Sequence, residues 1–195
     1  MYLIKGENME LENIIEIVKE RLSEKRFNHC VCVMKRAEEI ATKYGYDIEK
    51  AKKVGISHDI AKELSSEYKL KYVEENNIEI DDMEKENTTL LHAKIGAHMT
   101  KNLFGFSKEM TDAILAHTTG LPNMDMLSKI LFIADRTSSE RNFPDISYLN
   151  SLLDKNIDEA VLYILDKKIQ LQLEKRQTMH VNTVITRNEL LKNNI

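Results

Sequence analysis

The sequence predicts an all-α protein, folded as a single-domain helical bundle, on three observations. Its 195 residues include only two prolines and six glycines, so the residue types that most often end helices are scarce. Apolar residues recur at spacings of three and four, instead of alternating as they do in a strand. The length fits one domain with a buried core, and no repeat, linker or low-complexity tract divides the chain.

The first half of the chain shows four helices with recognisable ends. A helix over residues 10–22 carries one apolar stripe, formed by Leu11, Ile14, Ile15 and Val18. Asn28 is the predicted N-cap of the second helix, which ends before Gly45. Asp47 is the predicted N-cap of a third helix to about residue 62, and Ser65 or Ser66 caps a fourth toward residue 76.

The second half continues with helices after a polar, acidic loop over residues 77–86. Thr88 or Thr89 opens a helix that Gly105 closes, and Ser107 caps the next one, which reaches residue 117. Asp125 opens a helix to residue 136, and a loop containing Pro144 follows it. The last two predicted helices cover residues 157–175 and 183–191.

Residues 1–9 show no helical periodicity, so we expect a disordered N-terminal extension there and the folded domain over residues 10–195. Early acidic residues interrupt any signal peptide, and no stretch reaches the roughly 18 apolar residues of a membrane helix. The net charge of −4 gives no basic field for nucleic acid or anionic lipid. Cys30 and Cys32 would face different sides of a helix. These features predict a cytoplasmic protein with two reduced thiols and no nucleic-acid or membrane partner.

Four of the six histidines fall on predicted apolar stripes and should point into the core. They are His29, His58, His92 and His117. Asp135 also lies on an apolar face, and Asp59 directly follows His58. Burying an ionised carboxylate without compensation costs several kcal/mol or more, whereas a metal cation supplies both charge and a ligand field. His98 belongs to no motif, and we expect it at a helix surface or in packing.

Inward histidines and aspartates together predict a metal centre. Adjacent helical residues project about 100° apart, so His58 can ligate one ion while the Asp59 carboxylate bridges to a second. Imidazole and carboxylate ligands without thiolate suit Fe, Mn, Co or Zn.

Five short strings carry a family resemblance. They are K-R-F-N-H ending at His29, H-D-I-A-K-E-L from His58, L-L-H-A-K-I-G-A around His92, A-H-T-T-G around His117, and I-A-D ending at Asp135 with Arg141 beyond it. In this order they resemble the HD-domain superfamily of metal-dependent phosphohydrolases, and within it the YqeK-type symmetrical bis(5′-nucleosyl)-tetraphosphatases. The resemblance runs from about residue 21 to residue 191. After Asp135 the family often has Glu-Pro before the arginine, whereas this chain has T-S-S-E.

The resemblance implies an HD-type bundle around a buried centre of one or two metal ions, with Fe expected first and Mn, Co or Zn as alternatives. The implied ligands of the first ion are His29, His58, Asp59 and Asp135, and His58 and Asp59 are also the implied catalytic pair. His92 and His117 would complete a second metal site or bind substrate phosphate. The implied substrate-binding residues are Arg26, Lys62, Arg141 and His180. The expected substrate is a nucleotide, Ap4A, cleaved into two ADP, and a homodimer is compatible with the resemblance.

Two other functions stay open from the sequence. One is a different HD-type phosphohydrolase acting on deoxynucleotides, ppGpp or cyclic dinucleotides, although the G-Y-P string expected of the last group is absent. The other is a metal- or nucleotide-binding sensor without turnover, which the complete ligand set disfavours.

Overall fold

The structure is a computed structural model that describes residues 9–193, and within that range it contains eleven helices and no strand. The all-α fold is therefore confirmed. The extension expected before residue 10 lies outside the described residues except for Met9, whose N–H donates to the Phe104 carbonyl. No helix in residues 9–193 is both long enough and apolar enough to cross a membrane.

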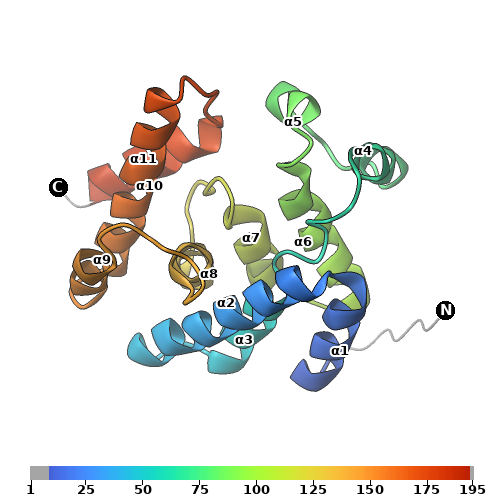
Figure 1. The fold of residues 1–195 in the computed structure, drawn as a ribbon, viewed down its shortest axis with the longest axis horizontal. Helices are drawn as coiled ribbons and strands as arrows, with labels where there is room; N and C mark the ends of the chain where they lie inside the picture. The colour runs from blue at the N-terminus through green and yellow to red at the C-terminus, as the bar shows by residue number, and fades with distance from the viewer. Residues whose placement is uncertain (1–8, 194–195) are drawn as a thin grey trace.

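The helices follow one another with short connections (Figure 1). They are α1 (Leu11–Arg21), α2 (Glu24–Lys43), α3 (Ile48–Ser57), α4 (Ser66–Glu75), α5 (Asp82–Glu86), α6 (Leu91–Phe104), α7 (Lys108–Ala116), α8 (Met126–Thr137), α9 (Ile146–Leu153), α10 (Ile157–Glu174) and α11 (Val181–Asn193).

Most of the predicted helix ends are confirmed by their capping contacts. The side chains of four predicted N-caps each accept a hydrogen bond from the backbone N–H three residues later, and these are Asp47, Ser65, Ser107 and Asp125. Gly45 and Gly105 follow the ends of α2 and α6 with φ of 61° and 71°. This left-handed conformation favours glycine, because a Cβ atom would crowd the carbonyl.

Two predicted boundaries near the site are wrong. The helix expected from Asn28 starts five residues earlier, since the Ser23 hydroxyl accepts the Arg26 N–H and caps α2. The third helix was expected to reach residue 62, but α3 ends at Ser57 and residues 58–63 form tight turns. The N–H groups of Ile60 and Lys62 bond to carbonyls three residues back rather than four. The His58–Asp59 pair therefore lies on a turn.

Three further details differ from the prediction. The acidic loop contains the short helix α5, which a reciprocal capping box of Asp81 and Glu84 stabilises. The loop with Pro144 is followed by α9, which the sequence analysis missed. Neither Thr88 nor Thr89 caps α6, which begins at Leu91 after a turn and has no side-chain cap.

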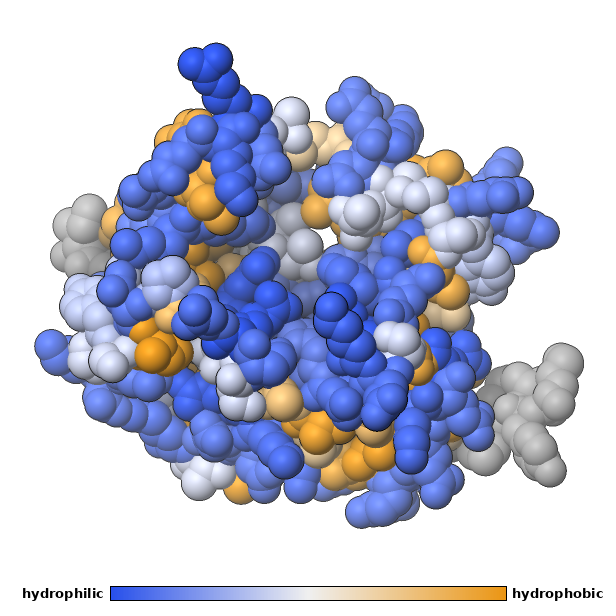
Figure 2. Space-filling view, in the orientation of Figure 1, coloured by the Kyte–Doolittle hydropathy of each residue, from blue (hydrophilic) through white to orange (hydrophobic). Residues whose placement is uncertain are grey.

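The packing places α8 at the centre of the bundle. This helix contacts α2, α3, α7 and α10, and its residues from Ile130 to Ala134 are fully buried. The pair α2 and α3 forms one side of the molecule, while α9–α11 and α4–α6 rise on either side of it (Figure 1). Figure 2 shows a hollow between these two flanks, with mostly hydrophilic residues around it.

Candidate metal centre

Six predicted site residues come together where five parts of the chain meet. His29 lies on α2, His58 and Asp59 on the turn after α3, and Asp135 on α8. His92 lies on α6 and His117 directly follows α7. All six are buried, with at most 7% of any residue exposed. The apolar stripes thus turn these polar side chains inward, as the sequence predicted.

The first donor group consists of His29, His58, Asp59 and Asp135. Asp59 Oδ2 lies 3.5 Å from His58 Nε2 and 3.8 Å from His29 Nε2. Asp135 Oδ1 lies 3.1 Å from His29 Nε2 and 3.6 Å from His58 Nε2. Two imidazole nitrogens and two carboxylate oxygens therefore surround one small volume.

The second donor group consists of Asp59, His92 and His117. The other carboxylate oxygen, Asp59 Oδ1, lies 3.4 Å from His92 Nε2 and 3.6 Å from His117 Nε2. The two Nε2 atoms are 3.0 Å apart. Within each of the triads His29–His58–Asp59 and Asp59–His92–His117, one ligand atom per residue lies within 4.8 Å of the others. Asp59 thus contributes one oxygen to each group, which is the arrangement that a bridging carboxylate requires.

Each of the four histidines has its other ring nitrogen held by an oxygen that can only accept. Nδ1 must therefore carry the hydrogen, which leaves Nε2 to face the centre. The acceptors are Gly55 O for His58 (2.8 Å), Ile114 O for His117 (2.6 Å), Thr89 O for His92 (2.5 Å) and the Glu140 carboxylate for His29 (2.5 Å). Histidines that bind metal are typically oriented in this way.

The donor atoms fit a cation better than they fit one another. Asp59 Oδ1 and His58 Nε2 are buried and have no hydrogen-bond partner among the described residues. His92 and His117 bring their Nε2 atoms together although neither ring has a second N–H to share. A buried polar atom without a partner costs roughly 1–3 kcal/mol. A metal ion would satisfy these atoms together, and the nitrogen and oxygen donors suit a first-row transition metal.

The ionisation of the centre also favours a cation. Burial disfavours charge on Asp59, but the electrostatic effect of the neighbouring His58 outweighs burial and holds the Asp59 pKa well below its ordinary value. Burial and the neighbouring His117 hold the pKa of His92 well below its usual range. For His58, Asp59 and Asp135 outweigh burial and raise the pKa to about 10 when no metal is bound. A cation in the first donor group would displace that proton, because ligation and protonation use the same nitrogen.

A family model for the HD domain matches residues 26–140, which include all six of these residues. The chain belongs to the HD domain family. It is 33% identical over 178 residues to the Halalkalibacterium halodurans protein named symmetrical bis(5′-nucleosyl)-tetraphosphatase, covering 91% of this chain and 95% of that one. A Bacillus subtilis protein of the same name is 30% identical, over 94% of this chain and 98% of its own length.

A solved HD-domain structure has the same fold. It is a crystal structure from Clostridium acetobutylicum, described as a predicted HD superfamily hydrolase involved in NAD metabolism. It matches with a TM-score of 0.90 and 33% identity, covering 95% of this chain and 99% of that one. The helical bundle therefore shares the fold of that structure along nearly its whole length.

Three of the predicted substrate-binding residues border the HD-domain centre, and each approaches a carboxylate. Arg26 Nη1 lies 3.0 Å from Asp59 Oδ2, and Arg141 Nη2 lies 2.7 Å from Asp135 Oδ1. Lys62 Nζ lies 4.0 Å from Asp59 Oδ1 and 3.1 Å from His92 Nε2. These three cations partly neutralise the two carboxylates of the centre.

The fourth predicted substrate-binding residue, His180, lies in a separate cluster. Its Nε2 is 3.1 Å from Asp81 Oδ2, and its Nδ1 accepts the Asn182 N–H at 3.2 Å. It lines a small cavity of about 110 Å³, to which Thr118 also contributes. His98, expected at a surface or in packing, lies 2.9 Å from the Tyr72 hydroxyl.

Two residues of the HD-domain centre were not among the predicted site residues. Glu140, the last residue of the T-S-S-E departure from the family pattern, holds the His29 ring through Nδ1. Thr118 Oγ1 lies 3.1 Å from His92 Nε2 and 3.0 Å from His117 Nε2. A carboxylate near a predicted ligand was the available signal for Glu140, since metal-bound histidines often donate to one.

Proposed function

We propose that this HD-domain protein hydrolyses dinucleoside tetraphosphates symmetrically, so that Ap4A gives two ADP. The observation that carries the proposal is the convergence of four Nε2 atoms on the two oxygens of Asp59. Two relatives that this chain matches over nearly their whole length are named for that reaction. The centre is assigned as the active site because it has what a catalytic metal site needs, oriented ligands and an adjoining cavity for substrate.

In the proposed centre, the first donor group holds one ion, with His29, His58, Asp59 and Asp135 as ligands. His92 and His117, with the other oxygen of Asp59, hold a second ion or the substrate phosphates. Iron is our expected metal, with Mn, Co or Zn as alternatives that the same donors accept. Lys62 must leave His92 Nε2 for a second ion to bind, because its ammonium lies 3.1 Å away. Burial lowers the pKa of Lys62, which reduces the electrostatic cost of that change.

Protein purified without chelator should therefore contain a first-row transition metal. Chelation should lower its melting temperature, because a ligand at 100 times its dissociation constant stabilises the folded state by about 2.7 kcal/mol. Elemental analysis and thermal denaturation, before and after metal is restored, measure both effects. A chain that takes up none of Fe, Mn, Co or Zn, and whose melting temperature ignores them, would contradict the assignment.

When bound, the metal supplies hydroxide near neutral pH by lowering the pKa of a coordinated water. Arg26 and Arg141 can bind phosphate oxygens with paired N–H groups, and Lys62 adds a point charge. These residues hold one ADP moiety so that the second phosphorus from its adenosine lies at the centre. The water oxygen bonds to that phosphorus, and the bridging oxygen leaves with the other ADP. Asp59 links the two donor groups, because one of its carboxylate oxygens faces each group.

The position of cleavage tests the proposal directly. If one nucleoside diphosphate arm is always held at the centre, Ap4A should yield only ADP, and Ap5A should yield ADP and ATP. A hundredfold preference between adjacent phosphorus atoms requires only about 2.7 kcal/mol of difference in transition-state stabilisation. Chromatography of both digests, with dGTP, ppGpp and cyclic-di-GMP as comparison substrates, identifies the products. AMP and ATP as the main products from Ap4A would overturn the symmetrical cleavage and leave the metal centre standing.

We also propose where the protein acts and with which partners. A net charge of −4 and two free cysteines are typical of a cytoplasmic protein that acts on small molecules rather than nucleic acid. A homodimer is compatible with the family resemblance, and light scattering of the purified protein tests it.

A further inference from the structure

Two basic side chains next to the metal centre converge on one backbone carbonyl. Arg136 on α8 donates from Nη2 to Thr118 O at 3.3 Å, and Lys168 on α10 donates from Nζ to the same oxygen at 2.8 Å. Lys168 Nζ also lies 3.3 Å from the Thr183 hydroxyl. Thr118 is the residue whose hydroxyl faces His92 and His117, so the pair lies one residue from the second donor group.

These two cations differ from the other basic residues around the centre. Arg26, Lys62 and Arg141 each lie within 4.0 Å of a carboxylate of the centre. Within residues 9–193, neither Arg136 nor Lys168 has an ion-pair partner at that distance. Their hydrogen-bond acceptors are neutral oxygens, so neither cation is paired directly with a carboxylate, although Arg136 is close enough to Asp135 to help lower the Asp135 pKa.

The surroundings of the two side chains make their positive charges costly. Arg136 Nε is buried and has no hydrogen-bond partner among the described residues. Burial and the nearby Arg136 lower the pKa of Lys168 to about 7. A partly buried cation beside a like charge is stabilised when an anion binds between them. Both donors are already directed by the protein, so an anion would lose little affinity to their ordering.

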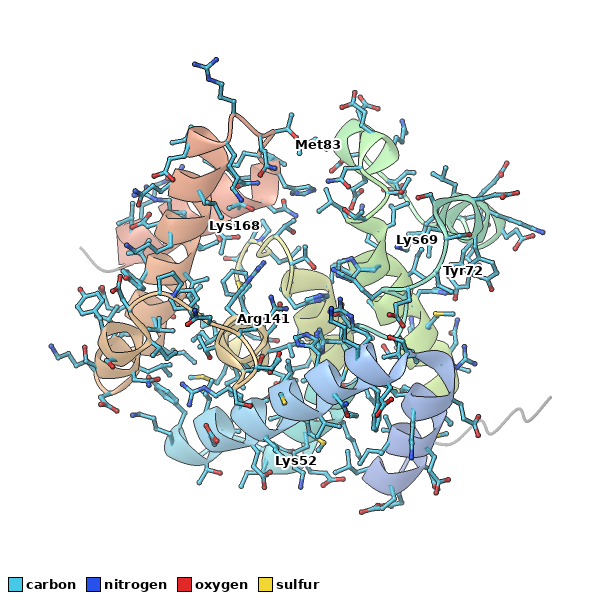
Figure 3. All side chains as sticks on the ribbon, in the orientation of Figure 1. Lys52, Lys69, Tyr72, Met83, Arg141 and Lys168 are labelled. Carbon is cyan, nitrogen blue, oxygen red and sulfur yellow. The ribbon has the colours of Figure 1, made fainter. Side chains whose placement is uncertain are left out.

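The pair opens onto a cavity large enough for a nucleotide. Its volume is about 560 Å³, within the usual range of ligand pockets. Arg136 and Lys168 line it together with Arg141, which also contacts Asp135 of the centre. Figure 3 shows Arg141 and Lys168 on the same side of the central hollow.

The composition of this cavity matches the two chemical parts of a nucleotide. Phe143, Pro144 and Leu171 add apolar surface suited to a nucleoside. The carboxylate that lines it, Glu174, is six residues beyond Lys168 on α10, or about 9 Å along the helix. Glu174 accepts a hydrogen bond from Gln170, and among the described residues it forms no ion pair with Arg136 or Lys168.

We propose that Arg136 and Lys168 form a binding site for the diphosphate of the departing ADP, whose nucleoside occupies the adjoining cavity. The inference rests on the proposed function, since it assigns the departing half of the dinucleotide to a binding site separate from the metal centre. The arm under attack is held at the metal centre by Arg26, Lys62 and Arg141. The departing arm then reaches past Thr118 to the second pair of cations.

Calorimetric titration of the metal-loaded protein with ADP tests the site without turnover. The parental protein should bind two ADP per chain, one at the centre and one at the cation pair. Lys168→Met and Arg136→Gln should each weaken one of these events about tenfold or more, as expected for loss of a charged hydrogen bond to phosphate. They should raise KM for Ap4A by a similar factor with a smaller change in kcat. Lys168→Arg, which keeps the charge, should retain the second event.

Lys155→Met is the matched control, because it removes an exposed lysine just before α10 that lines none of these cavities. It should bind two ADP with parental affinities. Circular dichroism and bound-metal analysis confirm that each variant is folded. If folded Lys168→Met and Arg136→Gln both bind two ADP with parental affinities, the proposed site is overturned. If the parental protein binds ADP through Lys168 but does not hydrolyse Ap4A, the anion site stands and the proposed function fails.

Discussion

Replacing Asp59 with asparagine should reduce kcat for Ap4A by about three orders of magnitude or more. Asparagine keeps the shape of the side chain but removes the negative charge that both donor groups share. One of its two terminal atoms would also become an N–H donor directed at histidine nitrogens that should ligate metal. Both the affinity for metal and the activation of water should therefore fall.

Turnover and metal content, measured on the same preparation, separate these two effects. Asp82→Asn is the matched control, because the Asp82 side chain is 94% exposed and its ion-pair partner within residues 9–193 is Lys85. It should behave as the parental enzyme. Arg141→Ala should instead raise KM more than it lowers kcat, since its proposed role is to bind substrate. Near-parental turnover in Asp59→Asn would remove Asp59 from the centre of the mechanism.

Replacing Gly55 with alanine should destabilise the protein by about 3 kcal/mol. A Cβ atom at this position would lie 2.7 Å from Met34 Cα and 3.1 Å from Met34 N. Both are backbone atoms, so no side-chain rotation relieves the clash and α2 and α3 must move apart. The same movement would disturb the centre, because α2 carries His29 and the Gly55 carbonyl holds the His58 ring.

Denaturant unfolding of Gly55→Ala and of the control variant Gly96→Ala, with and without metal, measures this loss of stability. At about 2–4 °C per kcal/mol for a chain of this size, the loss corresponds to roughly 6–12 °C in melting temperature. Gly96→Ala is the control, since its new Cβ would meet no atom closer than 3.4 Å. Alanine also favours a helix interior, so Gly96→Ala should be neutral or slightly stabilising. Equal stability of the two variants would contradict the close-packing argument.

The sequence was sufficient to predict the class of fold and the inward positions of the six central residues. Both depend on local periodicity, since a polar residue one turn from apolar ones must share their face. It failed where tertiary contacts decide the local structure. The turn at His58 is an example, because α3 ends at Ser57, next to the point where Gly55 packs closely against the α2 backbone. The short helices α5 and α9 lack the length that makes periodicity visible.

The sequence could not identify residues whose importance depends on neighbours distant along the chain. Arg136 follows a predicted ligand and Lys168 lies on the last long helix, and nothing in either local pattern links them. Only the docking of α10 on α8 brings both to Thr118. His180 was a candidate by resemblance alone, and its contacts are with Asp81 and Asn182.

The wide spacing of the central residues along the chain, from His29 to Asp135, also has a consequence for biosynthesis. A ribosome delivers the chain from its N-terminus at roughly 5–20 residues per second, so α2 and the His58–Asp59 turn emerge well before α8. Until Asp135 has left the exit tunnel and α8 has docked, the nascent chain presents two histidines and one carboxylate of the first donor group. A cation captured then would be held by an incomplete set of ligands. If the centre binds metal as proposed, stable loading would therefore follow the synthesis of α8, when every helix that carries a donor is available.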